Sequence, residues 1–342
     1  MATYSRNRTT LSFAILTFLM IAVGAVSLGL GFIEMTPGEL FAALSGDGKP
    51  EHQLVVREFR LPRLTLALIV GAGFSLSGLV LQGVSRNALA EPGIMGINAG
   101  AGFGVILLLY LTTRGGSFRG LADAPSLLLP FAALLGAAAA AATVFAIASR
   151  KGSVAPVRLL LVGIAVNAAV GAATLVVSMR LDPQLYDFAV TWLTGTLAGA
   201  GWQETLAPLP WLALFTPLVA VNAGVLDILG LGDEPAVGLG VPVERRRRVL
   251  LAAATGIAGA SVAVAGAVAF VGLMGPHIAR RLLGRAHRLT IPGSMLVGAV
   301  LVATADTLAR TIVAPVELPV GVVVSALGAP YFLYLLTRLR RI

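Results

Sequence analysis

The chain has 342 residues, of which 57% are hydrophobic and 12% are charged, and its formal net charge is +9. A soluble domain carries about a quarter charged residues, so this composition excludes an ordinary soluble protein and indicates a polytopic membrane protein. The basic residues form short clusters between apolar runs, a pattern that sets membrane topology and makes no nucleic-acid-binding stripe. Cysteine is absent, which excludes disulfides and thiolate metal sites.

The first apolar run, Leu11–Phe32, follows Arg6 and Arg8. A signal peptide has the same charge order, but its apolar core spans only about 7–15 residues, so we predict a retained membrane span. The polar stretch that comes next contains TPGEL. Here Thr36 can cap a helix that has Pro37 in its first position.

Nine more apolar runs are long enough to cross a membrane about 30 Å thick as helices. They are Leu61–Val84, Gly93–Thr112, Ser126–Ala148, Leu159–Met179, Leu206–Leu226, Arg248–Val264, Gly266–Leu283, Ile291–Val313 and Val320–Thr337. The two runs between residues 248 and 283 must share 36 residues. We therefore predict an all-α fold with about ten transmembrane helices, in a single membrane domain that covers residues 1–342.

Charge and small residues predict how these spans are arranged. With the N-terminus inside, 17 of the 25 Lys and Arg residues fall in cytoplasmic segments, which favours both termini in the cytoplasm. The glycine-rich spans predict close helix packing, with a glycine-lined path as the alternative. GAGFSLSG at 71–78 and GASVAVAG at 259–266 share a small-residue pattern in spans that cross in opposite directions. That pattern predicts an inverted internal repeat, which is common in transporters.

Motifs for chemistry within the chain are absent. No Walker A, HExxH or GxSxG sequence is present, so nucleotide hydrolysis is expected on another chain. We interpret His277 as a helix-terminal structural residue, with a ligand role as the alternative. Asp306 and Arg310 are four residues apart on one predicted helix and can form an ion pair. A proton relay through Asp306 is the alternative, but the chain offers few other groups for one.

Six blocks of sequence occur in order over nearly the whole chain. They are RLPRLTLALIVGAGFSLSGLVLQGVSRNALAEPGIMGINAGAG (60–102), RLLLVGIAVNA (158–168), WLTGTLAGAGW (192–202), LGDEPAVGLGV (231–241), FVGLMGPHIARRLLGRAHR (270–288) and ADTLARTIVAPVELPVGVVVSALGAPYFLYLL (305–336). Together they resemble the FecCD family, the permeases of iron-siderophore, haem and vitamin B12 ABC importers. One departure is visible, since the family has Asn-Pro-Leu where this chain has Asn87-Ala88-Leu89.

The resemblance implies a type II ABC importer permease in the bacterial inner membrane. Its expected partners are two ATPase subunits, a second permease chain that is either a copy or a paralogue, an extracytoplasmic substrate-binding protein, and membrane lipid. ATP and Mg²⁺ would bind to the ATPase subunits, and no cofactor, catalytic residue or metal site is expected in this chain. Nucleic acid is not an expected partner.

The stretch 227–243 resembles the family's cytoplasmic coupling element, two short helices that sit in a cleft of the ATPase. The residues assigned to coupling are Leu229, Gly230, Gly232, Asp233, Glu234, Pro235, Gly238, Leu239 and Gly240. Glycines permit sharp reversals between short helices, and we expect Gly232 and Gly240 to have positive φ. Asp233 or Glu234 can cap a helix start with Pro235 in its first position. The run Arg245–Arg248 would anchor the next span at the membrane surface. A solvated loop with a topogenic charge run is the alternative.

Two other sets of residues follow from the resemblance. Arg60, Arg63 and Arg310 match outer-face arginines that receive acidic residues of the binding protein, with interfacial snorkelling as the alternative. The second set matches loops that narrow the path at its cytoplasmic end, with ordinary loops as the alternative. It consists of Asn87, Ala88, Leu89, Ala155, Pro156 and Val157.

The predicted cargo is a ferric siderophore, with haem or cobalamin as the alternative within the family. A secondary transporter without an ATPase partner is the rival of a different class. A purely structural membrane scaffold would leave the coupling element unexplained.

Overall fold

The computed structural model describes residues 6–31, 33, 35–114, 125–150, 153–154 and 156–339. Almost all of this part is helical, which confirms the predicted all-α fold. The helices are α1 (Arg6–Gly29), α2 (Pro37–Ser45), α3 (Pro50–Leu54), η1 (Val55–Arg60), α4 (Leu61–Ser85), α5 (Ile97–Arg114), α6 (Pro125–Ala148), α7 (Pro156–Ser178), α8 (Pro183–Leu193), α9 (Trp202–Leu206), α10 (Leu209–Val221), α11 (Ala223–Leu229), α12 (Asp233–Gly238), α13 (Val243–Ala265), α14 (Val271–Leu283), α15 (His287–Thr311) and α16 (Val320–Leu339). Between α6 and α7, the two-residue strands β1 (Ser149–Arg150) and β2 (Ser153–Val154) pair antiparallel.

Each of the ten predicted spans falls on a helix, but the count of ten is approximate. Among the described residues, seven helices are long and apolar enough to cross a membrane. They are Asn7–Gly29, Pro50–Ser85, Leu128–Ala148, Val157–Ser178, Trp202–Val221, Val243–Ala265 and His287–Thr311. Ile97–Thr113 and Val320–Leu335 are shorter apolar helices. Helix α14 has 13 residues, so it is about 20 Å long and cannot cross a 30 Å core alone.

Two predicted spans need correction here, and one helix was missed. The sixth span was predicted to run to Leu226, but the helix ends at Val221, and α11 is a separate short helix. The eighth span is shorter than predicted, because residues 266–270 are irregular and α14 begins only at Val271. Helix α8 was not predicted at all, although Asp182 caps it by accepting a hydrogen bond from the N–H of Leu185 at 3.0 Å.

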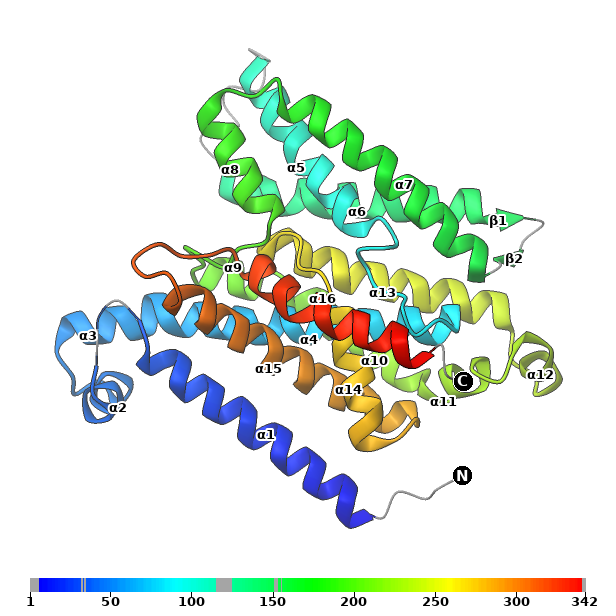
Figure 1. The fold of residues 1–342 in the computed structure, drawn as a ribbon, viewed down its shortest axis with the longest axis horizontal. Helices are drawn as coiled ribbons and strands as arrows, with labels where there is room; N and C mark the ends of the chain where they lie inside the picture. Colours follow the sequence, from blue (N-terminus) through cyan, green and yellow to red (C-terminus); the bar gives the residue numbers. More distant parts are fainter. Residues whose placement is uncertain are drawn as a thin grey trace.

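Helix α4 is central to the molecule, with α13, α14 and α15 packed around it (Figure 1). In its apolar window 78% of the residues are buried, against 17% for α1, which lies at the edge beside α15. Helices α5, α6 and α7 pack together on the other side of α13. As predicted, α4 and α13 run in opposite directions.

Glycines set the closest helix contacts, which supports the packing interpretation of the small-residue pattern. A Cβ added to Gly71 of α4 would lie 2.7 Å from the carbonyl carbon of Gly298 in α15. A Cβ added to Gly136 of α6 would lie 2.9 Å from the carbonyl carbon of Gly100 in α5. In both pairs the two backbones are in direct contact, which only small residues permit.

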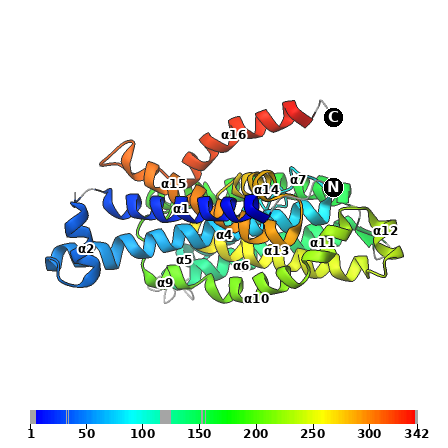
Figure 2. The same ribbon diagram turned by 90° about the horizontal axis from the view of Figure 1, so that it is seen from below.

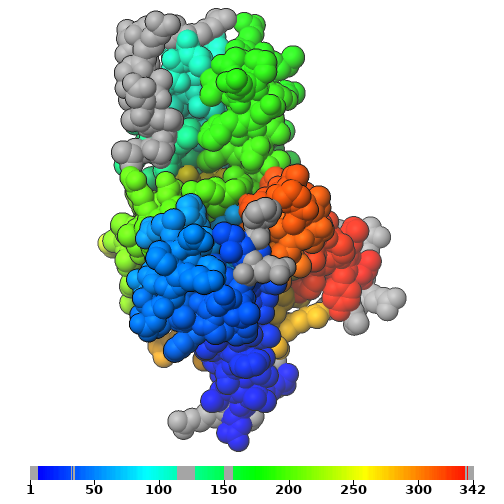
Figure 3. All heavy atoms as spheres, turned by 90° about the vertical axis from the view of Figure 1, so that its left-hand side faces the viewer, coloured from blue at the N-terminus to red at the C-terminus, as the bar shows by residue number. Residues whose placement is uncertain are grey.

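The elements divide between two ends of the molecule. Helices α11 and α12 lie at the right-hand end in Figure 1, and α1 begins and α16 ends toward that same end. Helices α2 and α3 and the α15–α16 connection lie at the left-hand end. Seen from this left-hand end, residues 37–60 occupy the centre of the face, and the segment around residue 310 lies beside them (Figure 3). In the turned view, α16 stands away from the body of the molecule along its second half (Figure 2).

The capping prediction at the start of α2 is confirmed. The Thr36 hydroxyl accepts a hydrogen bond from the N–H of Glu39 at 3.3 Å, and the Glu39 carboxylate accepts one from the N–H of Thr36 at 2.9 Å. Pro37 occupies the first helical position. The Thr36 hydroxyl also donates to the Glu39 carboxylate at 2.8 Å, and the two hydrogen bonds that this carboxylate accepts from Thr36 hold its pKa below the ordinary value.

Candidate functional site

The coupling element, residues 227–243, contains the short helix α12 and the end of α11 (Figure 1). Gly232 separates the two helices with φ of 120°, and Gly240 follows α12 with φ of 78°. Both angles lie in the left-handed region that glycine adopts without strain, as the sequence predicted. The backbone therefore reverses twice within ten residues, which lets two short helices project together from the end of the molecule.

The predicted cap of α12 is wrong in detail. Gly232 is the N-cap residue, Asp233 and Glu234 are the first two helical residues, and Pro235 is the third. The Asp233 carboxylate is committed to long-range contacts, because it accepts from Arg247 at 2.8 Å and from Arg86 at 3.2 Å. Its negative charge still lies in the first turn, where the helix dipole favours an acid.

One of the four consecutive arginines has a role that the sequence analysis missed. The Arg247 side chain is 2% exposed and donates to Glu244 at 2.8 Å as well as to Asp233. It lies under the coupling element and joins α12 to α13, so its function is not to meet lipid headgroups. The only hint in the sequence is the presence of nearby acids on both sides of the arginine run.

A second contact holds the coupling element to α15. The Asp227 carboxylate accepts a hydrogen bond from the N–H of His287 at 3.0 Å, and the same oxygen lies 2.6 Å from His287 Nδ1. Ala286, the residue at the N-cap of α15, has no side chain that could cap the helix. Asp227 therefore caps α15 from another helix, 60 residues away in the sequence.

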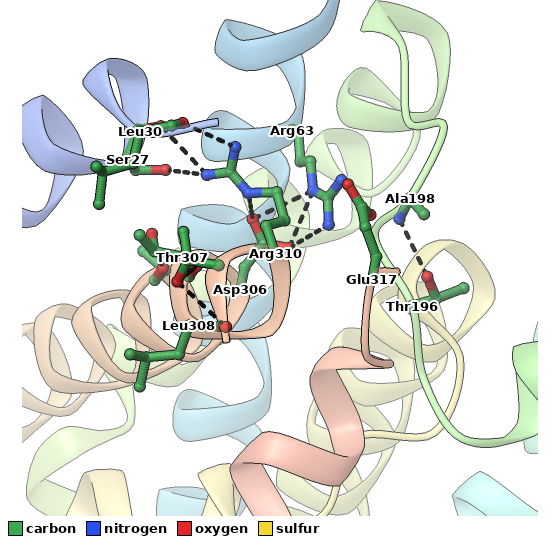
Figure 4. A network of polar contacts seen from close by, with 12 residues as sticks. Ser27, Leu30, Arg63, Thr196, Ala198, Asp306, Thr307, Leu308, Arg310 and Glu317 are labelled. Atoms are coloured by element: carbon green, nitrogen blue, oxygen red, sulfur yellow. Dashed lines mark hydrogen bonds and ion pairs between the residues drawn. The ribbon is translucent and has the colours of Figure 1, made fainter. Parts of the chain in front are cut away.

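Charged residues also gather at the opposite end of the molecule, where Asp306 is 1% exposed (Figure 4). The Arg63 guanidinium lies 2.9 Å from its carboxylate, and Arg310 lies 3.3 Å from it in the predicted i, i+4 pair. Arg63 also pairs with Glu317 at 2.8 Å. Burying a carboxylate costs several kcal/mol without such partners, and two arginines supply them here.

Arg60 and Arg310 also contact the end of α1. Arg60 donates to the carbonyl oxygens of Leu28 at 2.6 Å and Gly29 at 3.2 Å, and it contacts that of Ile33. Arg310 donates to the carbonyl oxygen of Ser27 at 3.2 Å and to its hydroxyl at 2.8 Å (Figure 4). The last carbonyls of a helix have no partner within the helix, so these arginines cap α1 from outside.

An open pocket of about 910 Å³ lies at this end, and Arg60, Arg63 and Arg310 line it together with Glu317. The three arginines assigned to docking are thus brought together, and they are named here the arginine cluster. Their side chains are mostly buried and bonded within the chain. They therefore act on an incoming partner through their electrostatic field, which is that of three arginines beside the carboxylates of Asp306 and Glu317.

The residues predicted to narrow the path lie in two connections. After α4, Asn87 forms a turn in which its side-chain oxygen accepts from the N–H of Leu89 at 2.9 Å, and Ala88 is exposed. Val157, in the first turn of α7, is 70% exposed. Pro156 is the first residue of α7, and Ala155 lies outside the described residues.

Glu91 is a buried acid that the sequence analysis did not single out. It lies in the connection between α4 and α5, is 8% exposed, and accepts a hydrogen bond from the N–H of Phe270 at 2.9 Å. Phe270 has φ of 66° and precedes α14. Burial raises the pKa of Glu91 to about 7, and the hydrogen bond from Phe270 opposes part of that rise. Among the described residues, no group of three or more His, Asp or Glu side chains could hold a metal ion.

Comparison with known proteins gives one consistent family. Residues 19–338 match the FecCD transport family. The iron(3+)-hydroxamate import system permease protein FhuG of Bacillus subtilis (strain 168) is 45% identical over 97% of this chain and 98% of its own length. The hemin transport system permease protein HmuU of Yersinia pestis is 38% identical over 97% of this chain and 96% of its own.

A solved structure is also similar to this chain. It is described as an inward-facing conformation of a metal-chelate type ABC transporter, and the TM-score is 0.82 at 29% sequence identity. The match covers 96% of this chain and 99% of that chain. Similarity over the full length of both chains means that the arrangement of helices is shared from end to end.

Proposed function

The chain belongs to the FecCD transport family, and from this premise we propose that it is the permease subunit of a metal-chelate ABC importer whose cargo is a ferric siderophore. The observation that carries the choice of cargo is the 45% identity, over nearly all of both chains, with a permease named for iron(3+)-hydroxamate import. Haem is the second candidate, because a permease named for hemin transport is 38% identical over a similar span.

In this proposal ATP is hydrolysed on two separate ATPase subunits that also hold Mg²⁺, and this chain is not an enzyme. The coupling element supports the proposal, because it presents an exposed apolar surface on a polar connection. Leu231, Val237 and Leu239 are each 63% exposed there. An exposed apolar patch rimmed by charged residues is typical of a protein–protein contact. Leu229 is 1% exposed and can only support the element from within the chain. The other residues of the predicted set stay assigned to this contact, and they are Gly230, Gly232, Asp233, Glu234, Pro235, Gly238, Leu239 and Gly240.

We place the coupling element and both termini in the cytoplasm, with the arginine cluster on the outer face. The charge distribution of the sequence supports this orientation. An extracytoplasmic binding protein would dock beside the pocket that Arg60, Arg63 and Arg310 line. A second permease chain, identical or paralogous, completes the path, and the turn at Asn87–Leu89 narrows it at the cytoplasmic end.

The proposal is tested by isolating the tagged chain from the membranes of its own cells and identifying what copurifies. We expect an ATPase subunit in stable complex, and purification of a chain that drives uptake without one would support a secondary transporter instead. The complex is then placed in vesicles with its binding protein. Uptake of a ferric hydroxamate, haemin and cobalamin is compared, and faster uptake of haemin would overturn the siderophore assignment.

A further inference from the structure

Two helices connect the coupling element with the arginine cluster. Helix α4 carries Arg63 near its start and is followed at its end by Arg86. Helix α15 begins at His287 and carries Asp306 near its end. The two helices run antiparallel and side by side through the centre of the molecule (Figure 1). His287 and Asp306 are 19 residues apart in one helix, a distance of about 28 Å.

At the coupling end, each helix has its own charged contact with the coupling element. Asp227 caps α15 through the N–H and the ring of His287, at 3.0 and 2.6 Å. Asp233 pairs with Arg86 at 3.2 Å, and Arg86 is the C-cap residue of α4. A displacement of α11 and α12 therefore acts directly on the ends of two helices, through the Asp227–His287 and Asp233–Arg86 contacts.

In the middle, the two helices cannot slide past each other freely. The backbones meet at Gly71 and Gly298, where an added Cβ on either residue would collide with the other helix. The hydroxyl of Ser75 donates to the carbonyl oxygen of Ser294 at 2.6 Å, four residues along each helix from that contact. Close packing of this kind transmits displacement, because packed interiors have low compressibility.

At the other end, the helices are joined again. The Arg63 guanidinium of α4 lies 2.9 Å from the Asp306 carboxylate of α15, which is 1% exposed. The same cluster holds the end of α1 through Arg310 and Ser27. Movement of α4 or α15 along its axis would change the positions of the charges that line the outer pocket.

We propose that α4 and α15 form a single rigid strut that transmits the state of the coupling element to the arginine cluster, with Asp227 and Arg86 as its positioning residues. The inference rests on the proposed function, since it takes the coupling element as the ATPase contact and the arginine cluster as the docking surface. A binding protein would then sense the nucleotide state through the strut, and the ATPase would sense docking with the same coupling free energy.

The test uses the whole complex of permease, ATPase subunits and binding protein in lipid nanodiscs. The Kd of the labelled binding protein is measured without nucleotide and with a non-hydrolysable ATP analogue. Coupling between sites commonly changes affinity by about 5- to 150-fold, and we expect the wild-type ratio in that range. Asp227→Ala and Arg86→Gln should bring the ratio below about twofold while the complex stays assembled.

Two variants separate positioning from general damage. Asp227→Asn keeps an oxygen that can cap α15, so it should restore most of the wild-type ratio. Arg246→Gln removes a 3.0 Å contact between α13 and Asn222 that involves neither α4 nor α15, and it should leave the ratio unchanged. A wild-type ratio of 1, or an unchanged ratio in both Asp227→Ala and Arg86→Gln, would overturn the strut. Failure of the wild-type chain to bind an ATPase would instead overturn the proposed function.

Discussion

Replacing Gly298 by alanine should separate the two central helices and destabilise the protein. The new Cβ would lie 2.5 Å from the Cβ of Ser75 and 2.9 Å from the carbonyl carbon of Gly71. The carbonyl oxygen of Gly71 would lie closer still, and ordinary contact begins near 3.4 Å, so α4 and α15 would have to move apart by at least about 0.9 Å. Overpacking of this size costs about 1–3 kcal/mol. The gain in helix propensity from glycine to alanine is at most about 1 kcal/mol, so the net effect should be destabilising.

The matched control is Gly171→Ala in α7. Nothing lies within 4 Å of the position that its Cβ would take, so only the gain in helix propensity applies and the protein should become slightly more stable. Thermal unfolding in detergent is followed by the fluorescence of the three tryptophans. The two variants should shift the midpoint in opposite directions. A midpoint for Gly298→Ala at or above that of wild type would refute the argument that these backbones are in unyielding contact.

Three more predictions follow from the geometry of the described residues. Gly232→Val and Gly240→Val should lower the uptake per ATP hydrolysed without preventing folding. The reason is that φ angles of 120° and 78° impose roughly 1–3 kcal/mol of strain on a β-branched residue. Wild-type ratios of uptake to hydrolysis, measured in the same vesicles, would contradict this prediction. The pKa of Glu91 is raised to about 7 in the folded protein from an ordinary 4.5, so the folded state favours the protonated carboxyl. The resulting contribution to the free energy of unfolding is fully present below pH 4.5 and should be lost as the pH rises through 7. Glu91→Gln should flatten that part of the melting profile, and an unchanged slope would show that another group is responsible. Arg63→Gln should lower the free energy of unfolding by about 3 kcal/mol, because it removes the nearest cation from the Asp306 carboxylate, which is 1% exposed. An unaltered unfolding midpoint would mean that Arg310 alone is enough to neutralise Asp306.

The local features of the coupling element could be predicted from the sequence, because they depend on single residues. Positive φ at Gly232 and Gly240 follows from the need to reverse the chain between short helices, and the structure has it at both positions. The burial of Arg247 could not be predicted in the same way. Its partner Asp233 is 14 residues away on another helix, and four identical arginines give no sign of which one faces inward.

The same limit applies to the arginine cluster. The pair of Asp306 and Arg310 could be predicted, because residues four apart share one face of a helix. The closer partner, Arg63, is 243 residues away in the sequence, and only the packing of α4 against α15 brings it there. Helix α8 was missed for a different reason. Its 11 residues are too few to cross a membrane, so a long apolar run does not reveal it.

Helix α14 has a consequence for how the chain is made. Its 13 residues end with Arg280 and Arg281 in the last turn, so the apolar part of the helix is shorter still than the roughly 20 residues that a membrane span needs. We expect such a segment to be unable to leave the translocon for lipid by itself. Gly272 and Gly275 of α14 lie against Gly78 and Ser75 of α4, so its place is prepared by a helix synthesised some 200 residues earlier. We therefore expect α14 to enter the membrane only after α15 has been synthesised, so that the two helices insert together.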